Sequence, residues 1–484
     1  MMSNPKRLHP AAMIFSVIHS IKTSIFSLLP IVILAIGEAK WIYVVIAAGA
    51  LVTIIIISSI LSWLRYTYQL EEDQIRIEQG VLIRKKRTIS KHRIQSIDLS
   101  QNIIHRIFGL TKVQIETAGN DHKIDATLHA VTMDEGKMVH DQLKYNQVPK
   151  DIEVDTNEHP EDEKKHPSRK ITPKALIIAG STSGSFGVIL GLIGLGFSEI
   201  ESIIPDRYYN HATDWVFSQA IQILILLAIV ALIILWLLGI LVTLIQYWDF
   251  TITRYEKELF ITRGLLEKKQ STIPLKRIQA VGVVETIIHQ PLGLAKIYVD
   301  IASGEMGSDS EMHTVLFPLI RKSEVQNFLR ELLPEYEYNI DQWISLPKRA
   351  LPYYLFRLAI LPLIVTIVFY FTLTDWAYIP LIVTILACLL AYFQYKTIGY
   401  EIKGEHLFIR NRDLSKDTII VKHRRLQAMK KKQHFIQKKQ NLASLDTAIL
   451  NKFLGRHFIV RDLEQEDVDK ISDWYSYQKN RSNI

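Results

Sequence analysis

Cysteine is almost absent from this chain. The 484 residues include one cysteine, Cys388, and it lies inside an apolar run. A lone cysteine forms neither an intrachain disulfide nor a thiolate metal cluster, so the soluble parts carry no sign of an oxidising compartment. The sequence also lacks a Gly-rich phosphate loop, a His-Glu-x-x-His motif and a Gly-x-Ser-x-Gly motif. We therefore expect no enzyme, no metal site and no cofactor.

Charged residues are absent from the middle of six long apolar runs. Each run is close to the roughly 20 residues that a helix needs to cross a bilayer, and 48% hydrophobic content is high for a soluble protein. The first run is followed closely by a second and lacks a small-x-small cleavage site, so it is not a cleaved signal peptide. The runs cover residues 15–36, 41–64, 175–197, 216–245, 351–371 and 377–393. They predict six membrane helices arranged as three hairpins.

Lysine and arginine are scarce in the short links inside these hairpins. The links hold Lys40, Arg207 and, in 372–376, no basic residue. Nearly all other basic residues lie in the terminal segments or between hairpins, so the positive-inside rule places both termini and the soluble segments in the cytoplasm. The net charge of +8 then suits an anionic membrane surface. We expect an integral membrane protein and no nucleic-acid partner.

Three segments of the chain superpose without a gap. Arg93-Ile94-Gln95 matches Arg277-Ile278-Gln279 at an offset of 184 residues (93 to 277), and Arg425-Leu426-Gln427 at a further 148 (277 to 425). The same offsets superpose Ile77, Ile261 and Ile409, and then Leu110, Leu294 and Leu442. Such agreement predicts one unit of hairpin plus soluble domain that occurs three times.

The soluble part of each unit has the pattern of short strands closed by a helix. In the first unit, strands are predicted over 74–78, 81–83, 87–99 and 112–117, with glycines between them. Amphipathic helices are predicted over 132–143, 323–333 and 464–475. The expected fold is therefore a polytopic α-helical membrane protein with three small cytoplasmic β-barrels or sandwiches, each capped by a C-terminal helix.

The repeats and the apolar runs together set the expected domain boundaries. Hairpins should occupy residues 13–64, 173–246 and 350–394. Soluble domains should occupy 65–147, 247–340 and 395–484. A charged linker, 148–172, should separate the first soluble domain from the second hairpin.

The order of these elements resembles a known family. Two membrane helices, a strand, a glycine turn, Arg-Ile-Gln-x-hydrophobic, a short amphipathic turn, Gly-Leu and a strand are similar to the bacterial pleckstrin-homology-like (PH-like) membrane proteins, and the triple arrangement resembles the YdbT type. The resemblance implies three PH-like domains, each a bent antiparallel barrel capped by a helix. It also implies a bacterial cell membrane, a smaller companion protein of the same family, and roles in envelope stress or resistance to membrane-active peptides.

The third unit departs from this pattern at two turns. Arg412 stands where the other units have Gly80 and Gly264, and Asn441 stands where they have Gly109 and Gly293. The turn geometry of the third unit is therefore expected to depart from that of the other two, although Asn tolerates a positive φ better than most residues.

The repeated Arg and Gln are candidate contact residues with two open interpretations. They could pair with carboxylates or backbone groups at the rim of each barrel, or they could contact a headgroup or partner protein, for which Arg supplies a forked donor. Ile94 and Ile97 are three residues apart, which indicates a β-bulge between them. The six candidates are Arg93, Gln95, Arg277, Gln279, Arg425 and Gln427.

The third domain also carries a run of basic residues without an acid. Near an inner leaflet, each basic residue contributes about 1 kcal/mol of attraction to anionic lipid, although a charge run is also typical of a solvated surface. Interleaved apolar residues such as Leu426 and Ile436 fit core spacing better than base stacking. The candidate lipid patch comprises Lys422, Arg424, Lys430, Lys431, Lys432, Lys438 and Lys439.

Two further patterns involve glycine and histidine. Gly180, Gly184, Gly187, Gly191 and Gly194 lie on one face of the third apolar run, where they permit close helix packing within the hairpin or with another chain. His105 and His289 occupy equivalent positions, but without a recurring second ligand they are interpreted as half-exposed histidines.

These observations favour a non-enzymatic membrane scaffold that presents its soluble domains to partner proteins or anionic lipid. The alternative is a transporter or exporter of hydrophobic peptides or lipids. The absence of charges at the middle of the apolar runs counts against that alternative.

Overall fold

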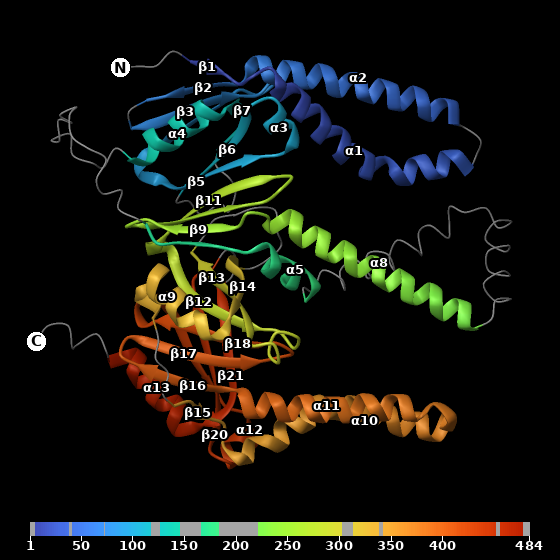
Figure 1. The fold of residues 1–484 in the computed structure, drawn as a ribbon, viewed down its shortest axis with the longest axis vertical. Coiled ribbons are helices and arrows are strands. Elements are labelled where there is room, and N and C mark those ends of the chain that lie inside the picture. Colours follow the sequence, from blue (N-terminus) through green and yellow to red (C-terminus); the bar gives the residue numbers. More distant parts are fainter. Residues whose placement is uncertain are drawn as a thin grey trace, which may run out of the picture. The chain divides into compact units, whose positions relative to one another are not determined.

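The computed structural model describes residues 5–37, 41–71, 73–117, 126–145, 166–182, 221–302, 313–337, 342–451 and 455–477 (Figure 1). Contacts divide the chain into two units. The first comprises Met1–Thr251 and Phe260–Thr272, and the second comprises Ile252–Leu259 and Ile273–Ile484.

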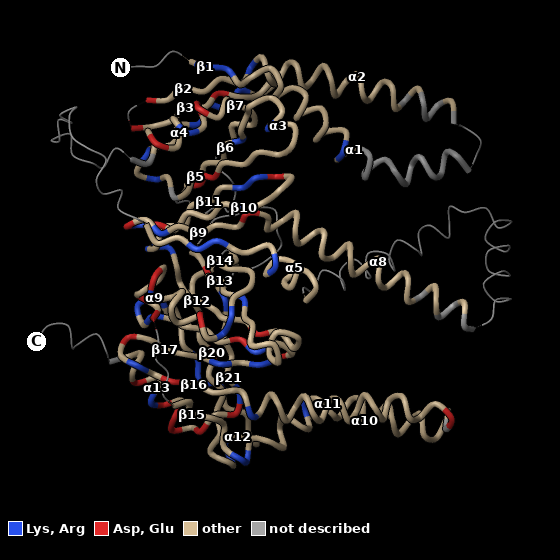
Figure 2. The backbone as a smooth tube through the Cα atoms, in the orientation of Figure 1, with Lys and Arg blue, Asp and Glu red and all other residues tan. Residues whose placement is uncertain are grey.

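Long apolar helices account for much of the described chain. Four segments are long and apolar enough to cross a membrane, namely Ala48–Arg65, Ile229–Tyr247, Lys348–Thr372 and Tyr378–Thr397. Figure 2 shows that α8, α10 and α11 are almost free of charged residues along most of their length. The run 15–36 lies in α1 but is not among these four segments, and the run 175–197 extends beyond the described residues, so the arrangement of six helices in three hairpins stays a prediction. The helices are α1 (Ala11–Gly37), α2 (Trp41–Arg65), α5 (Pro173–Ser181), α8 (Ile221–Tyr247), α10 (Leu351–Thr372) and α11 (Tyr378–Thr397).

The soluble part of the first repeat has two antiparallel sheets. One sheet has the order β1-β2-β3-β4, and β5, β6 and β7 are neighbours in a second sheet. Helix α4 packs against the second sheet and buries Val139 and Leu143. Each such buried aliphatic side chain contributes roughly 1.5–3 kcal/mol. The elements are β1 (Lys6–Arg7), β2 (Thr67–Leu70), β3 (Gln74–Gln79), β4 (Lys85–Ser90), β5 (Ile94–Gln101), α3 (Ile103–Ile107), β6 (Leu110–Thr117), β7 (Ala126–Thr132) and α4 (Met133–Tyr145).

The second repeat follows the same sequence of elements. Strands β8 (Ser168–Lys170), β9 (Thr251–Arg254), β10 (Glu258–Arg263) and β11 (Lys268–Pro274) come first. Strands β12 (Ile278–Glu285), β13 (Leu294–Ile301) and β14 (Thr314–Arg321) follow, and α9 (Val325–Leu332) closes the repeat.

The third repeat lies entirely in the second unit. Its core includes buried residues from both of its sheets and from α13. Helix α10 is attached to this core, because Arg357 donates to the buried Asp462 at 3.1 Å and the Tyr354 hydroxyl donates to the Arg461 carbonyl at 3.1 Å. The elements are β15 (Ile344–Ser345), β16 (Gly399–Lys403), β17 (His406–Arg412), β18 (Lys416–Lys422), β19 (Leu426–Lys432), α12 (Phe435–Lys439), β20 (Leu442–Ile449), β21 (Arg456–Glu464) and α13 (Gln465–Tyr477).

Several details of the first repeat differ from the sequence-based prediction. Residues 81–83 form a turn and not a strand, because Gly80 has φ 108° and a Cβ there would lie 2.0 Å from the Ile83 carbonyl oxygen. The predicted strand 87–99 is two strands, which the 3₁₀ turn Lys91–Arg93 separates. Strand β7 was not predicted. The three closing helices are confirmed.

The two turns of the third repeat behave as their residues suggest. Asn441 adopts φ 52°, close to the 65° and 63° of Gly109 and Gly293. Arg412, in contrast, is the last residue of β17, so this strand extends where the other repeats turn at a glycine. A residue with a side chain can occupy this position because the positive φ is not required there.

Candidate functional site

Each Arg-Ile-Gln segment lies at the start of an equivalent strand. The arginines end the 3₁₀ turns Lys91–Arg93, Leu275–Arg277 and His423–Arg425, and strands β5, β12 and β19 begin at the next residue. The pairing register shifts between Ile94 and Ser96, between Ile278 and Ala280, and between Leu426 and Ala428. The predicted β-bulge is therefore confirmed, and each glutamine occupies the bulged position.

In the second repeat both candidate side chains bind backbone. Arg277 donates from Nε and Nη2 to the Ala302 carbonyl at 3.2 and 3.1 Å. Gln279 is buried and donates from Nε2 to the Arg277 carbonyl at 3.0 Å. These bonds satisfy carbonyls where the bulge interrupts the strand ladder.

The other candidates have different surroundings. Arg425 donates to the Lys276 carbonyl at 2.5 Å, whereas Gln427 is exposed. Arg93 is exposed and has contacts of its own. The side chain of Gln95 lies outside the described part of the structure. The five described side chains therefore have different contacts, and their common feature is their position at the start of an equivalent strand.

Strand β5 joins the first repeat to the start of the second. Leu99, Ser100 and Gln101 pair antiparallel with Gln270, Lys269 and Lys268 of β11, respectively. Beside this ladder, Asp98 Oδ1 accepts the Thr272 amide at 3.3 Å and Arg106 donates to the Leu265 carbonyl at 2.9 Å. The edge of one repeat is thus extended by a strand of the next.

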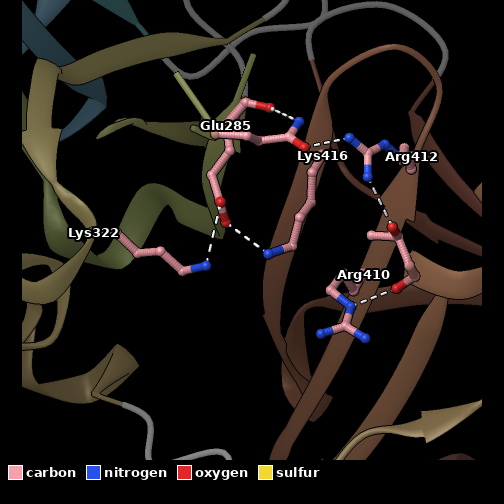
Figure 3. A network of polar contacts seen from close by, with 7 residues as sticks. Glu285, Lys322, Arg410, Arg412 and Lys416 are labelled. Atoms are coloured by element: carbon pink, nitrogen blue, oxygen red, sulfur yellow. Dashed lines mark hydrogen bonds and ion pairs between the residues drawn. The ribbon is translucent and has the colours of Figure 1, made fainter. Parts of the chain in front are cut away.

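Strand β12 joins the second repeat to the third in the same way. Its residues Ala280–Glu285 pair with Val421–Lys416 of β18, so one sheet runs in the order β14-β13-β12-β18-β17-β16-β15. Glu285 is buried and pairs with Lys416 at 2.8 Å and with Lys322 at 3.3 Å (Figure 3).

A hydrogen-bonded chain continues from this ion pair. Gln290 donates to the Glu285 carbonyl at 3.0 Å and accepts from Arg412. Arg412 also donates to the Thr397 hydroxyl at 3.0 Å, and Arg410 donates to the Thr397 carbonyl at 2.5 Å (Figure 3). The residue that replaces the turn glycine in the third repeat therefore helps to hold the two repeats together.

A second polar cluster is buried at the same junction. Asp300 on β13 is 0% exposed, and Arg456 on β21 donates to both of its carboxylate oxygens at 2.8 and 2.7 Å. The Tyr298 hydroxyl donates to Asp417 at 2.7 Å and accepts from Arg456 at 3.0 Å. Burial raises the pKa of Asp300, and it raises the pKa of Asp417 to about 6. The sequence did not indicate this cluster, because its acids and its tyrosine lie far apart in the chain and belong to no motif.

Gly282 makes room for that cluster. A Cβ at this position of β12 would lie 1.9 Å from Cζ of Tyr298. The Tyr298 ring therefore crosses β12 where the strand has no side chain, and its hydroxyl reaches the strand of the next repeat.

The candidate lipid patch divides into paired and unpaired residues. Lys422 is 7% exposed, and both it and Arg424 bind Glu335. Lys431 pairs with Asp469 at 2.5 Å, and Lys432 pairs with the buried Asp446 at 2.7 Å. Lys430 on β19 and Lys438 and Lys439 on α12 are exposed and form no ion pair in the described chain, so these three form the unpaired part of the patch.

His105 and His289 are buried, so the prediction that they are half-exposed is wrong. His105 is 4% exposed, bonds Asn102 Oδ1 at 2.6 Å and bonds the His129 carbonyl at 2.8 Å. Burial lowers the pKa of His105 and of His289. In the third repeat Gln437 fills this position and donates to Ser444 at 3.0 Å. All three are packed polar residues beneath a short turn.

One glycine of the predicted seam lies in the described chain. A Cβ on Gly180 would come 2.9 Å from the Ile240 Cα, so α5 approaches α8 closely at this point. The seam residues Gly184, Gly187, Gly191 and Gly194 lie outside the described residues. Within the described ranges, no group of three or more His, Cys, Asp or Glu side chains is placed to hold a metal ion.

These features define a class of protein in which apolar helices carry repeated, strand-joined PH-like domains. A model of the bacterial PH domain matches residues 24–147, 216–336 and 355–479. The chain is also 34% identical to the UPF0699 transmembrane protein YdbT of Bacillus subtilis (strain 168), over 99% of both chains. No solved structure matches the chain. This chain therefore belongs to the bacterial PH-domain family of the YdbT type, and that membership points to a non-catalytic membrane protein.

Proposed function

We propose that this protein is a membrane scaffold whose three PH-like domains bind partner proteins or anionic lipid at the cytoplasmic face of a bacterial cell membrane. The observation that carries the proposal is the strand pairing between repeats. Strand β5 pairs with β11, and β12 pairs with β18. Two of the three strands that begin with the repeated Arg-Ile-Gln segment therefore connect one repeat to the next. Each joined sheet offers a larger protein surface for a partner than one repeat alone.

The cytoplasmic orientation rests on the distribution of lysine and arginine. Basic residues are concentrated outside the short links within the hairpins, which favours the cytoplasm for both termini and all three domains. The test is to label single engineered cysteines in the Cys388→Ser background of intact cells with an impermeant maleimide. Protection of a cysteine at position 257 or 470 until the cells are lysed supports this orientation, and labelling from outside contradicts it.

Lipid binding is assigned to the accessible basic residues Lys430, Lys438 and Lys439. Together they place three positive charges in one domain without an ion-pair partner in the described chain. At about 1 kcal/mol each, three residues supply about 3 kcal/mol of attraction to an anionic surface. This attraction falls with salt, because the Debye length shortens to about 8 Å at 0.15 M.

The lipid proposal is tested on the full chain in mild detergent. Native mass spectrometry would count the phosphatidylglycerol and phosphatidylcholine molecules retained at low salt by the protein and by a variant with Lys430, Lys438 and Lys439 each replaced by Gln. The variant should lose the preference for phosphatidylglycerol. A control with Gln at Lys257, Lys276 and Lys470 should keep it, and equal loss in both variants would count against the patch.

The partner proposal is tested by purifying the protein from its native membrane under the same conditions. Co-purification of a smaller PH-like protein, or of other membrane proteins in fixed proportion, supports the scaffold. Flux of hydrophobic peptides into liposomes that contain this chain alone would instead support the alternative of a transporter.

A further inference from the structure

In the described part of the chain, the strand pairing between repeats leaves one edge strand of the first repeat and one of the third without a neighbour. In the internal junctions, a β5-type strand of one repeat pairs with the fourth strand of the next. The fourth strand of the first repeat is β4, and the β5-type strand of the third repeat is β19. Each is the last strand of its sheet, in the orders β1-β2-β3-β4 and β19-β20-β21.

The exposure of β4 reflects its open edge. Thr88 of β4 is exposed, whereas its equivalents Thr272 in β11 and Ile420 in β18 are 1% and 0% exposed. In the described part of the chain, β4 pairs only with β3. An edge strand of this kind presents free N–H and C=O groups that another strand can pair with.

The internal register shows what a second copy of this chain would place on that edge. At the second junction Gly282, Val283 and Val284 lie opposite Ile419, Thr418 and Asp417. The repeat offsets carry these positions to Lys430, Lys431 and Lys432 on β19 and to Arg87, Lys86 and Lys85 on β4. All three opposed pairs would join two cationic residues, and like charges directly opposite each other destabilise strand pairing. Within each chain, Lys86 pairs with Glu78, Lys431 with Asp469 and Lys432 with Asp446.

Neither internal junction opposes like charges: the first places the uncharged Gln101 opposite Lys268, and the second contains an ion pair. In the second junction the outermost opposed residues, Glu285 and Lys416, form this ion pair at 2.8 Å. The residue equivalent to Lys416 is Arg84, which directly precedes β4. Carboxylates therefore suit the strand that pairs with β4, whereas the lysines of β19 do not.

We propose that the outer edge of β4 is a docking site for an edge strand of a separate PH-like chain, which carries carboxylates opposite Arg84–Arg87, and that the lysines of β19 exclude a second copy of this chain. This inference deepens the proposed scaffold function by naming the class of partner and its site. The support is continuity with the two internal junctions and charge complementarity. The docked strand would extend the first sheet as β11 and β18 extend theirs.

The test uses a charge-altered full chain as the acidic probe. Lys430→Glu and Lys431→Glu place carboxylates opposite Arg87 and Lys86 and leave the Lys432–Asp446 ion pair intact. The tagged probe, in detergent and at low salt, should capture untagged wild-type chain at least tenfold more than tagged wild type does. Capture should weaken as salt increases, because the pairing depends on opposite charges.

Two variants locate the contact. Replacement of Lys86 with Glu in the untagged chain should reduce capture about tenfold, because a carboxylate then faces the Lys431→Glu position. A tagged control with Lys438→Glu and Lys439→Glu carries the same change in net charge away from the strand edge, and it should capture no more than wild type. Thermal unfolding of each variant confirms that it is folded.

Three results would overturn the proposal: a folded probe that captures no wild-type chain, equal capture by the control, or capture that Lys86→Glu does not weaken. If tagged wild-type chain captures untagged wild-type chain through β4, the lysines of β19 do not exclude a second copy. These measurements involve neither added lipid nor co-purified protein. Failure here would leave the scaffold proposal standing, and failure of the lipid and purification experiments would not prevent capture.

Discussion

Replacing Arg456 with methionine should destabilise the junction between the second and third repeats strongly. The change keeps much of the side-chain volume but removes the hydrogen bonds of 2.8 and 2.7 Å to Asp300, a residue that is 0% exposed. Removing one partner of a buried ion pair costs about 3–5 kcal/mol, because the remaining charge is left uncompensated. The melting temperature should fall by on the order of 10 °C.

The assay is thermal unfolding of the full chain in detergent, followed by tryptophan fluorescence at pH 7 and pH 5. Burial already raises the pKa of Asp300, and loss of Arg456 should raise it further. The folded variant then binds a proton that the unfolded chain does not hold at pH 5, so its stability rises as the pH falls. The deficit relative to wild type should therefore be smaller at pH 5.

A second substitution makes the reasoning refutable. Adding Asp300→Asn to Arg456→Met removes the unpaired charge, so the double variant should regain most of the lost stability. Arg461→Met, on the same strand but exposed, should change stability by less than about 0.5 kcal/mol. If the double variant is no more stable than Arg456→Met, or if the deficit is the same at both pH values, the buried charge is not the cause.

Three other substitutions test separate parts of the fold by thermal unfolding. Gly264→Ala should cost about 1–3 kcal/mol, because its Cβ would lie 2.0 Å from the Glu267 carbonyl oxygen at φ 107°; an unchanged melting temperature would contradict this. Asp417 has a pKa raised to about 6, so wild type loses stability as pH rises through that value. Asp417→Asn should therefore gain relative to wild type between pH 4 and 7, and a constant difference would argue against it. Gly180→Leu should separate α5 from Ile240 and lower the melting temperature. An unchanged melting temperature would contradict close packing of the two helices at this point.

Much of the local structure was predictable from the sequence. The repeat offsets placed equivalent strands, and Ile94 and Ile97 at a spacing of three predicted the bulge. Gly80 has a positive φ in its turn, and Asn441 replaces a glycine in the left-handed region. These features depend on a few neighbouring residues, so a single sequence carries their signal.

The candidate site was less predictable. The sequence singled out Arg277 and Gln279, whose contacts are to backbone, but it did not indicate that their strand pairs with another repeat. It also grouped Lys422 with exposed lysines, although Glu335 binds it in a buried position. Acids distant in the chain determine which basic residues are ion-paired, and only the folded protein shows where those acids lie.

The sequence by itself determined the apolar helices, the triple repeat and the chemistry of its turns, because hydrophobic period, charge distribution and backbone conformation are local properties. Only the tertiary structure decided that β5 pairs with β11, that β12 pairs with β18, and that Arg456 neutralises Asp300. Strand pairing uses the N–H and C=O groups that every residue except proline has, so the side chains of paired strands do not identify their partners. The lysines of the edge strands β4 and β19 could be interpreted only once that pairing was known.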